Sequence, residues 1–135
     1  MQFVADLSHL TQMMQFIRDR AHSYSIPDAV IGKIELAAEE AIVNIISYAY
    51  RDISSKDKQI MIHCTKREDG AFEVSVRDGG IPFNPLKFES EVDMHKPLNE
   101  RKIGGLGIYL MEQLMDEVSY FRDEEENVLR LIKYL

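Results

Sequence analysis

The sequence contains few of the residues that build disulfide frameworks or membrane spans. Its single cysteine, Cys64, cannot form a disulfide within the chain, and we expect it to be a small core side chain in a strand. No stretch approaches the ~20 apolar residues of a membrane-spanning helix. The N-terminus lacks a basic segment followed by an apolar one, which predicts no signal peptide. These absences predict a cytoplasmic protein with no membrane partner.

Positive charge is also scarce. The chain has 16 Lys and Arg against 23 Asp and Glu, a formal net charge of −7. Such a field repels phosphate backbones, so we expect no nucleic-acid partner. A single small anion such as ATP can still bind an acidic protein through Mg²⁺ and local backbone N–H groups. The 135 residues, 45% of them hydrophobic, predict one domain, 1–135, with a real core.

The periodicity of apolar residues and the turn signals predict an α+β fold. Ser8 is the expected cap of the first helix, and Asp69-Gly70 is typical of a hairpin turn. Residues 84–103 have weak periodicity, and loops of that length are usually lids or binding loops. The predicted elements are an edge strand within 1–6, helices at about 8–24 and 27–50, strands at 59–66 and 71–77, a helix at about 105–116, and strands at 117–122 and 127–134. This order predicts a two-layer sandwich, a mixed and mostly antiparallel sheet with helices on one face.

Three short segments could carry chemistry, and the first is on the long predicted helix. Glu40 and Asn44 are four residues apart, so their side chains are neighbours on one helix face. Carboxylate and amide oxygens suit Mg²⁺, and a carboxylate beside a triphosphate can accept a proton from an attacking hydroxyl. The alternative is an ordinary solvated helix face.

The second segment, Asp78-Gly79-Gly80-Ile81-Pro82-Phe83-Asn84-Pro85, follows a strand. An Asp at a strand end can accept a hydrogen bond from the exocyclic amine of adenine, and Gly80 would permit a tight turn and the approach of a flat ring. A simple turn is the alternative, since Asp, Gly, Pro and Asn are common turn residues.

The third segment is Gly104-Gly105-Leu106-Gly107, at the start of a predicted helix. Glycines at that position free backbone N–H groups to face phosphate, and the helix dipole favours the anion. The segment follows neither the dinucleotide-binding fingerprint nor the P-loop pattern, and a flexible hinge is the alternative.

The three segments, in this order, resemble the boxes of the GHKL ATPase superfamily of gyrase, heat-shock chaperones, histidine kinases and mismatch-repair proteins. The stretches EEAIVNIISYAY, VRDGGIPFNP and ERKIGGLGIYLMEQLMDEVSY are most similar to the bacterial anti-sigma-factor serine/threonine kinases. The similarity covers about residues 8–134. It implies the two-layer α/β sandwich of the GHKL (Bergerat) type.

The resemblance also implies a role for each site residue. Glu40 would be the general base, and Asn44 would bind Mg²⁺. Asp78 would contact the adenine amino group, with Gly80 shaping that pocket. Residues 84–103 would form the ATP lid. The phosphates would lie against the third segment, Gly104, Gly105, Leu106 and Gly107.

Other positions are less defined by the resemblance. Arg101 is either a phosphate or partner contact or an ordinary exposed Arg. Phe83, included among the nucleotide-binding residues, is expected to pack under the lid more than to touch ligand. Tyr48 stands where many members carry His, and Asn84 stands where Asp is common, which leaves partner choice open.

The first functional hypothesis is a Ser/Thr protein kinase that transfers the γ-phosphate of Mg·ATP to a STAS-domain anti-anti-sigma protein. The alternative is a homodimeric binding module that sequesters a sigma factor, with nucleotide acting only as a switch. In either case the resemblance implies a homodimer, formed through the N-terminal segment. The catalytic piece of a histidine kinase is a third hypothesis, disfavoured because no helical hairpin with a phosphoacceptor His precedes the domain.

Overall fold

The structure is a computed structural model that describes residues 1–50, 58–84 and 103–135, with the backbone alone for 103–108. Its strands are β1 (Gln2–Val4), β2 (Gln59–Lys66), β3 (Phe72–Asp78), β4 (Glu117–Asp123) and β5 (Glu126–Lys133). Its helices are α1 (Leu10–Ser23), α2 (Asp28–Asn44) and α4 (Ile103–Leu114), with a short 3₁₀ helix η1 (Leu7–His9) and a π-helix η2 (Ile45–Ala49).

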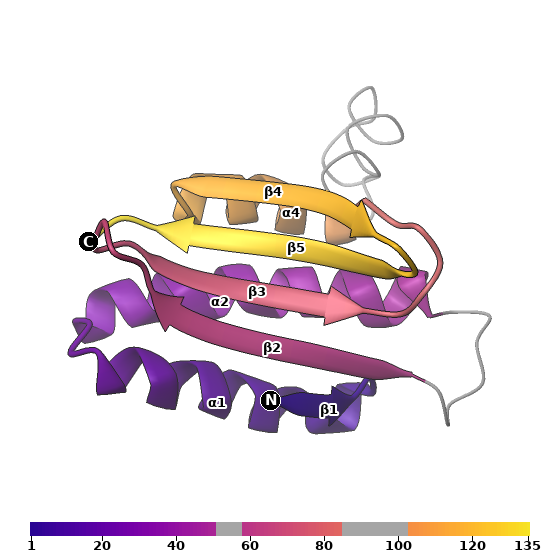
Figure 1. Cartoon of the computed structure of the whole chain (residues 1–135), viewed down its shortest axis with the longest axis horizontal. Coiled ribbons are helices and arrows are strands. Elements are labelled where there is room, and N and C mark those ends of the chain that lie inside the picture. Colours follow the sequence, from indigo (N-terminus) through magenta and orange to yellow (C-terminus); the bar gives the residue numbers. More distant parts are fainter. Residues whose placement is uncertain (51–57, 85–102) are drawn as a thin grey trace.

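These elements form two layers (Figure 1). One layer is a five-stranded sheet in the order β1-β2-β3-β5-β4, and the other is made by α1, α2 and α4 on one of its faces. All four strand pairings described are antiparallel, where a mixed and mostly antiparallel sheet was expected. The predicted α+β sandwich with helices on one face is confirmed.

Alternation of apolar and polar residues gives the sheet its buried face. In β2, Ile60, Ile62 and Cys64 are buried toward the helices, while Met61 and His63 point to the other face and are exposed. The prediction that Cys64 is a core residue is confirmed. Because it is buried, the pKa of its thiol is raised to about 12.

Small residues let α2 lie close to the sheet. Apolar residues at helical spacing, Ile34, Ala38 and Ala41 in α2 and Ile45 in η2, are buried, and Ala37 is buried beside them. None of the helices in the part of the chain that the structure describes is both long enough and apolar enough to cross a bilayer.

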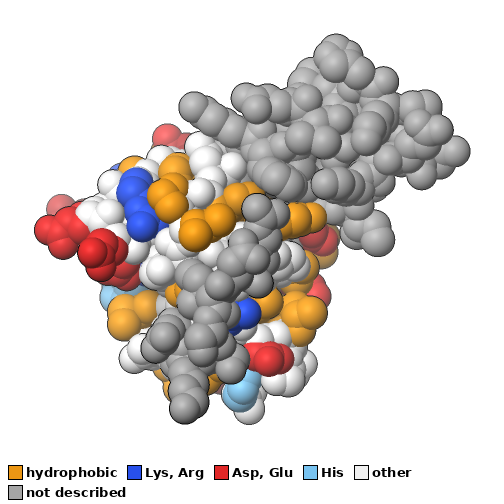
Figure 2. Space-filling view, turned by 90° about the vertical axis from the view of Figure 1, so that its right-hand side faces the viewer, with side chains coloured by type: hydrophobic (Ala, Val, Ile, Leu, Met, Phe, Trp, Pro, Cys, Tyr) orange, Lys and Arg blue, Asp and Glu red, His pale blue; other side chains and the backbone are white. Residues whose placement is uncertain are grey.

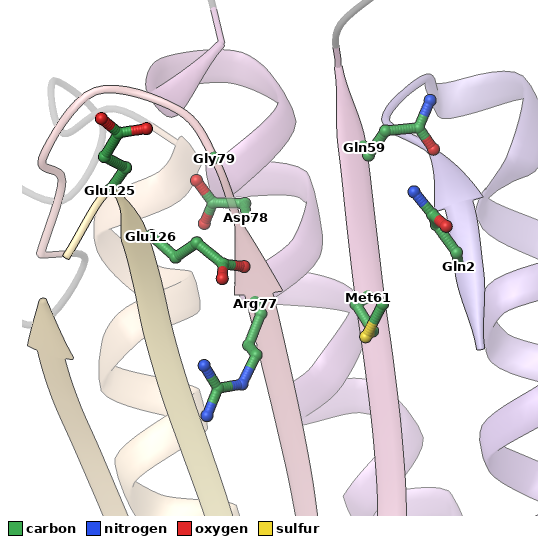
Figure 3. A pocket seen from close by; sticks show the side chains of 8 residues that line it. All are labelled: Gln2, Gln59, Met61, Arg77, Asp78, Gly79, Glu125 and Glu126. Carbon is green, nitrogen blue, oxygen red and sulfur yellow. The ribbon is translucent and has the colours of Figure 1, made fainter. Parts of the chain in front are cut away.

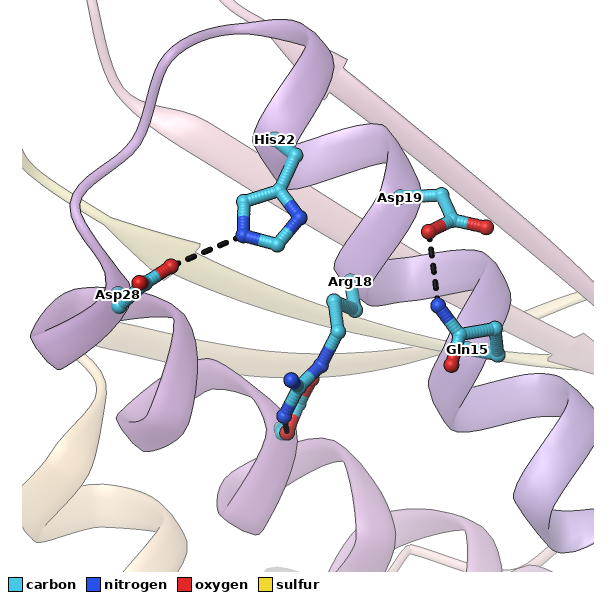
Figure 4. Close-up of polar contacts among 6 residues, drawn as sticks. Gln15, Arg18, Asp19, His22 and Asp28 are labelled. Carbon is cyan, nitrogen blue, oxygen red and sulfur yellow. Dashed lines mark hydrogen bonds and ion pairs between the residues drawn. The ribbon is translucent and has the colours of Figure 1, made fainter.

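Polar contacts join α1 to α2 (Figure 4). Arg18 Nη2 donates to Glu35 Oε2 over 2.8 Å, and His22 Nε2 lies 2.9 Å from Asp28 Oδ1. Arg18, His22 and Asp28 are exposed and Glu35 is half-buried, and pairs with exposed partners usually contribute less than about 1 kcal/mol. The apolar side chains of α1 that point to the sheet, including Met13 and Ile17, therefore contribute more to holding this helix in place.

Two local predictions need correction. The expected cap at Ser8 is wrong: α1 begins at Leu10 with His9 as its N-cap and no side-chain cap bond, and Ser8 lies in the preceding η1. The cap of η1 is Asp6, whose carboxylate accepts from Ser8 N over 2.8 Å. The helix predicted over 27–50 is α-helical only to Asn44 and continues as the π-helix η2. Most of the predicted lid, 84–103, lies outside the described residues.

Candidate functional site

The Asp78 turn begins where β3 ends. Asp78 is only 3% exposed, and its Oδ1 accepts from Gly80 N over 3.0 Å and from Asn127 Nδ2 over 2.9 Å. Burial raises the pKa of this carboxyl above its ordinary value, and the bonds from Asn127 and Gly80 offset part of that effect. The result is a buried carboxylate held by one of its oxygens.

Gly80 brings this turn against the end of the long helix. Ile81 N donates to Ala49 O over 3.0 Å. A Cβ on Gly80 would lie 2.5 Å from Ala49 O and 2.8 Å from its carbonyl carbon, which is closer than atoms can approach. The immediate reason for glycine at 80 is therefore the helix backbone. The predicted approach of a flat ring to Gly80 stays a prediction.

Two tyrosines near the helix end contact the same turn. The Tyr50 hydroxyl accepts from Gly79 N over 2.7 Å and donates to Gln59 O over 2.5 Å. Tyr48 stacks on Phe83, with ring centroids 5.6 Å apart. Sequence reasoning did not find Tyr50, because nothing local shows that the helix end meets the β3 turn.

Glu40 and Asn44 lie one turn apart on α2, as predicted. Asn44 is buried, at 3% exposed, and within the described part of the chain no group accepts from its Nδ2. An unpaired buried donor costs about 1–3 kcal/mol, so this amide is suited to a ligand oxygen. Glu40 is partly buried, and its pKa is raised by burial first and by neighbouring Glu39 second.

The glycine segment forms the beginning of α4. Gly104, Gly105 and Gly107, with Leu106 between them, fall within this helix, which starts at Ile103. Helix α4 packs beside α2, and its start lies at the end of the molecule where α2 and β3 also end (Figure 1). Figure 2 views this end, where hydrophobic side chains reach the surface. Arg101 lies outside the described residues, so its role stays a prediction.

A hollow of about 290 Å³ opens beside Asp78, on the face of the sheet opposite to α2 (Figure 3). Gln59, Met61 and Arg77 line it from the sheet face turned away from the helices. Glu125 and Glu126 add negative charge, which is unfavourable for a triphosphate. Glu40 and Asn44 do not line it, so this hollow does not join the long helix to the Asp78 turn.

Asn127 is the buried polar residue of this region that sequence reasoning missed. It lies at the start of β5, opposite Asp78 in the sheet register, and is 3% exposed. A polar residue next to buried Val128 and Leu129 was the available signal. Only the pairing of β3 with β5, distant in sequence, shows that it reaches Asp78.

The sequence matches the histidine kinase-like ATPase domain family over residues 3–133. The chain belongs to this family. The match covers almost all of its length and contains Glu40, Asn44, the Asp78 turn and the glycine segment.

Curated relatives of this family member include two proteins named serine-protein kinase RsbW. The one from Bacillus mycoides strain KBAB4 is 34% identical over 105 residues, which are 76% of this chain and 62% of the relative. The one from Listeria monocytogenes strain EGD-e is 32% identical over 108 residues, 78% of this chain and 66% of the relative. The chain thus spans slightly less than two thirds of these relatives.

Solved structures of other proteins share the fold. The RsbU and RsbW domains of Rv1364c from Mycobacterium tuberculosis match with a TM-score of 0.66 at 16% identity, over 100% of this chain and 32% of that one. The histidine kinase domain of Erythrobacter litoralis EL346 matches with a TM-score of 0.61 at 17% identity, over 95% of this chain and 60% of that one. At such identities the likeness shows the fold alone.

Proposed function

We propose that this chain is an ATP-dependent serine/threonine protein kinase that acts as an anti-sigma regulatory factor. One observation carries the proposal: the Asp78 turn is docked on the end of the helix that bears Glu40 and Asn44, through Ile81 N and Ala49 O at 3.0 Å. The buried Asp78 carboxyl therefore follows a turn that contacts the continuation of α2, and α2 carries the buried amide of Asn44 and the partly buried carboxylate of Glu40. The relatives named serine-protein kinase support this reaction.

Adenine recognition falls to Asp78 in this proposal. Its Oδ1 already accepts two hydrogen bonds, and within the described part of the chain no group donates to its Oδ2. That oxygen is available to the 6-amino group of adenine. A hydrogen bond to a charged acceptor is worth about 1.5–3 kcal/mol, so this contact would contribute a large part of the base affinity.

Asn44 is the residue that fits Mg·ATP. Its amide is buried and its Nδ2 has no acceptor in the described part of the chain, so this NH₂ group could donate to a phosphate oxygen, while Mg²⁺ would be held by the amide oxygen. Bound Mg²⁺ would neutralise charge on the phosphates during transfer. The start of α4, with Gly104, Gly105 and Gly107, would offer backbone N–H groups to the same phosphates.

Glu40 would act as the general base. It stands one helical turn before Asn44, so a hydroxyl beside the phosphates lies within its reach. The proton of a substrate Ser or Thr would pass to its carboxylate as the hydroxyl oxygen bonds to the γ-phosphorus and the bond to ADP breaks. Its raised pKa makes it a better proton acceptor than an ordinary exposed Glu.

The substrate and assembly are also part of the proposal. The substrate would be a STAS-domain anti-anti-sigma protein, and a sigma factor would be a second partner, in the cytoplasm. Two copies of the chain would pair through the N-terminal segment, where Met1, Val4 and Leu7 expose large apolar side chains.

The test is phosphoryl transfer to a defined partner. The protein is incubated with Mg²⁺, γ-labelled ATP and the STAS-domain protein encoded beside its gene, and the labelled residue is identified by mass spectrometry. We expect label on one Ser or Thr, and none on a partner in which that residue is Ala. Sigma-factor capture without transfer would favour the binding module instead. Label on a histidine would point to a histidine kinase.

Replacement of Asp78 by Asn tests the adenine contact. The new amide keeps an oxygen for Gly80 N and Asn127 Nδ2, but it presents an NH₂ where Oδ2 was. We expect ATP affinity to fall about 10- to 100-fold or more, since one hydrogen bond to a charged acceptor is lost and two donors then face each other. Isothermal titration calorimetry measures the change, and unchanged affinity would exclude the contact.

The same variant has an expected stability effect. Burial raises the pKa of folded Asp78 above its unfolded value, so the charged form is disfavoured in the fold. The stability that the Asp78 carboxyl contributes is therefore fully present at a pH below its unfolded pKa. It is lost as the pH rises through the folded pKa of Asp78. At neutral pH the Asp78→Asn variant lacks this charge, so its melting temperature should equal or exceed that of the parent. The difference between the two melting temperatures should become smaller in acid. A variant that unfolds at neutral pH would contradict this.

A further inference from the structure

Asn127 uses all of its hydrogen-bonding capacity inside the protein. Its Nδ2 donates to Asp78 Oδ1 over 2.9 Å and to Ile81 O over 2.8 Å. Its Oδ1 accepts from three donors: Tyr120 Oη at 2.6 Å, Arg122 Nη1 at 3.1 Å and Phe83 N at 3.2 Å. An amide NH₂ has two hydrogens to donate, and both are used here, so Asn127 has none to offer a ligand.

This network fixes which way the amide faces. In the flipped orientation the NH₂ group would meet Arg122 Nη1 and Phe83 N, which only donate, and the oxygen would meet Ile81 O, which only accepts. The donor therefore faces Asp78. Together with Gly80 N, it occupies Asp78 Oδ1 and leaves Oδ2 as the oxygen without a donor in the described part of the chain.

We infer that Asn127 is the positioning residue that sets purine selectivity at the proposed nucleotide site, by holding Asp78 as an ionised acceptor with one free oxygen. This inference rests on the proposed function. An acceptor favours a 6-amino group, as in adenine, and opposes a 6-oxo group, as in guanine or hypoxanthine. Asn127 does not touch the purine and acts only through Asp78.

Charge around Asp78 makes this donor necessary. Burial disfavours the ionised carboxyl, and the carboxylate of Glu126 opposes ionisation further, while Arg122 favours it. The bond from Asn127 is the largest of the effects that keep the charged form. Without it, Asp78 would more readily bind a proton and become a donor, which accepts a 6-oxo purine as well as a 6-amino one.

The experiment compares ATP with ITP, which differ at the 6-position of the purine. Dissociation constants for both are measured by calorimetry on the full chain, for the parent and for Asn127→Asp. The replacement keeps the oxygen that Tyr120, Phe83 and Arg122 use but removes both donors. We expect the parent to prefer ATP about 10- to 100-fold, the value of one hydrogen bond to a charged acceptor. In Asn127→Asp the preference should fall to about threefold or less.

Controls separate positioning from general structural damage. Tyr120→Phe removes one donor to Asn127 Oδ1 and leaves Nδ2 on Asp78, so it should keep the parent preference. Asn127→Ser removes the amide without adding charge. If Asn127→Asp does not fold, Asn127→Ser takes its place in the comparison of ATP with ITP. A purely structural role would weaken ATP and ITP equally and leave their ratio unchanged.

The outcomes are distinct for the two proposals. A parent that binds neither nucleotide overturns the proposed function and this inference with it. A parent that transfers phosphate from ATP but binds ATP and ITP equally overturns only the inference. The inference also fails if a folded Asn127 variant keeps the parent's preference for ATP.

Discussion

Replacement of Glu40 by Gln is expected to slow phosphoryl transfer by about 10²- to 10⁴-fold, the usual contribution of a general base. ATP affinity should change little, because the variant keeps the shape of the side chain and leaves Asn44 and Asp78 in place. Single-turnover transfer from labelled ATP to the STAS-domain partner measures the rate, and calorimetry measures the affinity. Equal transfer by variant and parent would discard the assignment of Glu40 as the base.

Glu39 provides a matched control for this variant. It precedes Glu40 on the same helix and is exposed, so Glu39→Gln should leave the rate at neutral pH close to the parent's. Glu39 also raises the pKa of Glu40, and a base works only when it is deprotonated. The acid limb of the parent's rate profile should therefore lie above the ordinary Glu pKa, and it should move to lower pH in Glu39→Gln. A limb that does not move would argue that another group is titrating.

Gly80→Ala is expected to destabilise the fold by about 3 kcal/mol, the upper part of the range for overpacking. The added Cβ would meet three atoms of Ala49, at 2.5, 2.8 and 2.9 Å, and two of them are backbone atoms of the helix end that cannot rotate away. Either the turn must leave η2 or the helix must shift. Both movements displace Asp78, so ATP binding should fall together with stability. Urea unfolding followed by circular dichroism measures the loss.

Gly32→Ala is the corresponding control. Gly32 lies in α2, and a Cβ there would meet nothing within 4 Å. Because Ala has a higher helix propensity, this change should be neutral or stabilising by up to about 1 kcal/mol. If Gly80→Ala is as stable as Gly32→Ala, the close approach between the turn and the helix end is not a constraint on the fold.

Local patterns were enough to predict most of the secondary structure. The alternation of 59–66 with its Asp69-Gly70 turn located the first hairpin, which the structure has as β2 and β3. The periodicity of apolar residues predicted a helix over 27–50, and in the structure the residues at that spacing are buried. The start of α1 was missed because a 3₁₀ helix, η1, precedes it with Asp6 as its cap, and α1 itself begins after His9 without a side-chain cap for the sequence to reveal.

The parts of the site that the sequence did not reveal depend on contacts between distant segments. Asn127 reaches Asp78 because β5 pairs with β3, and these residues are 49 positions apart. Tyr50, which directly follows the π-helix η2, reaches Gly79, 29 positions further along the chain. Periodicity reports which face of an element is buried, but it does not report which residues meet across two elements. The motif therefore pointed to Asp78 and Gly80 but not to Asn127 or Tyr50.

The buried Cys64 makes this protein convenient for spectroscopy. It is the chain's only cysteine, 1% exposed, and its thiol carries a pKa of about 12, so almost no thiolate is present near neutral pH. Maleimide dyes and nitroxide spin labels react with thiolates. A reporter cysteine introduced at an exposed position can therefore be labelled in the folded protein without first removing the native one.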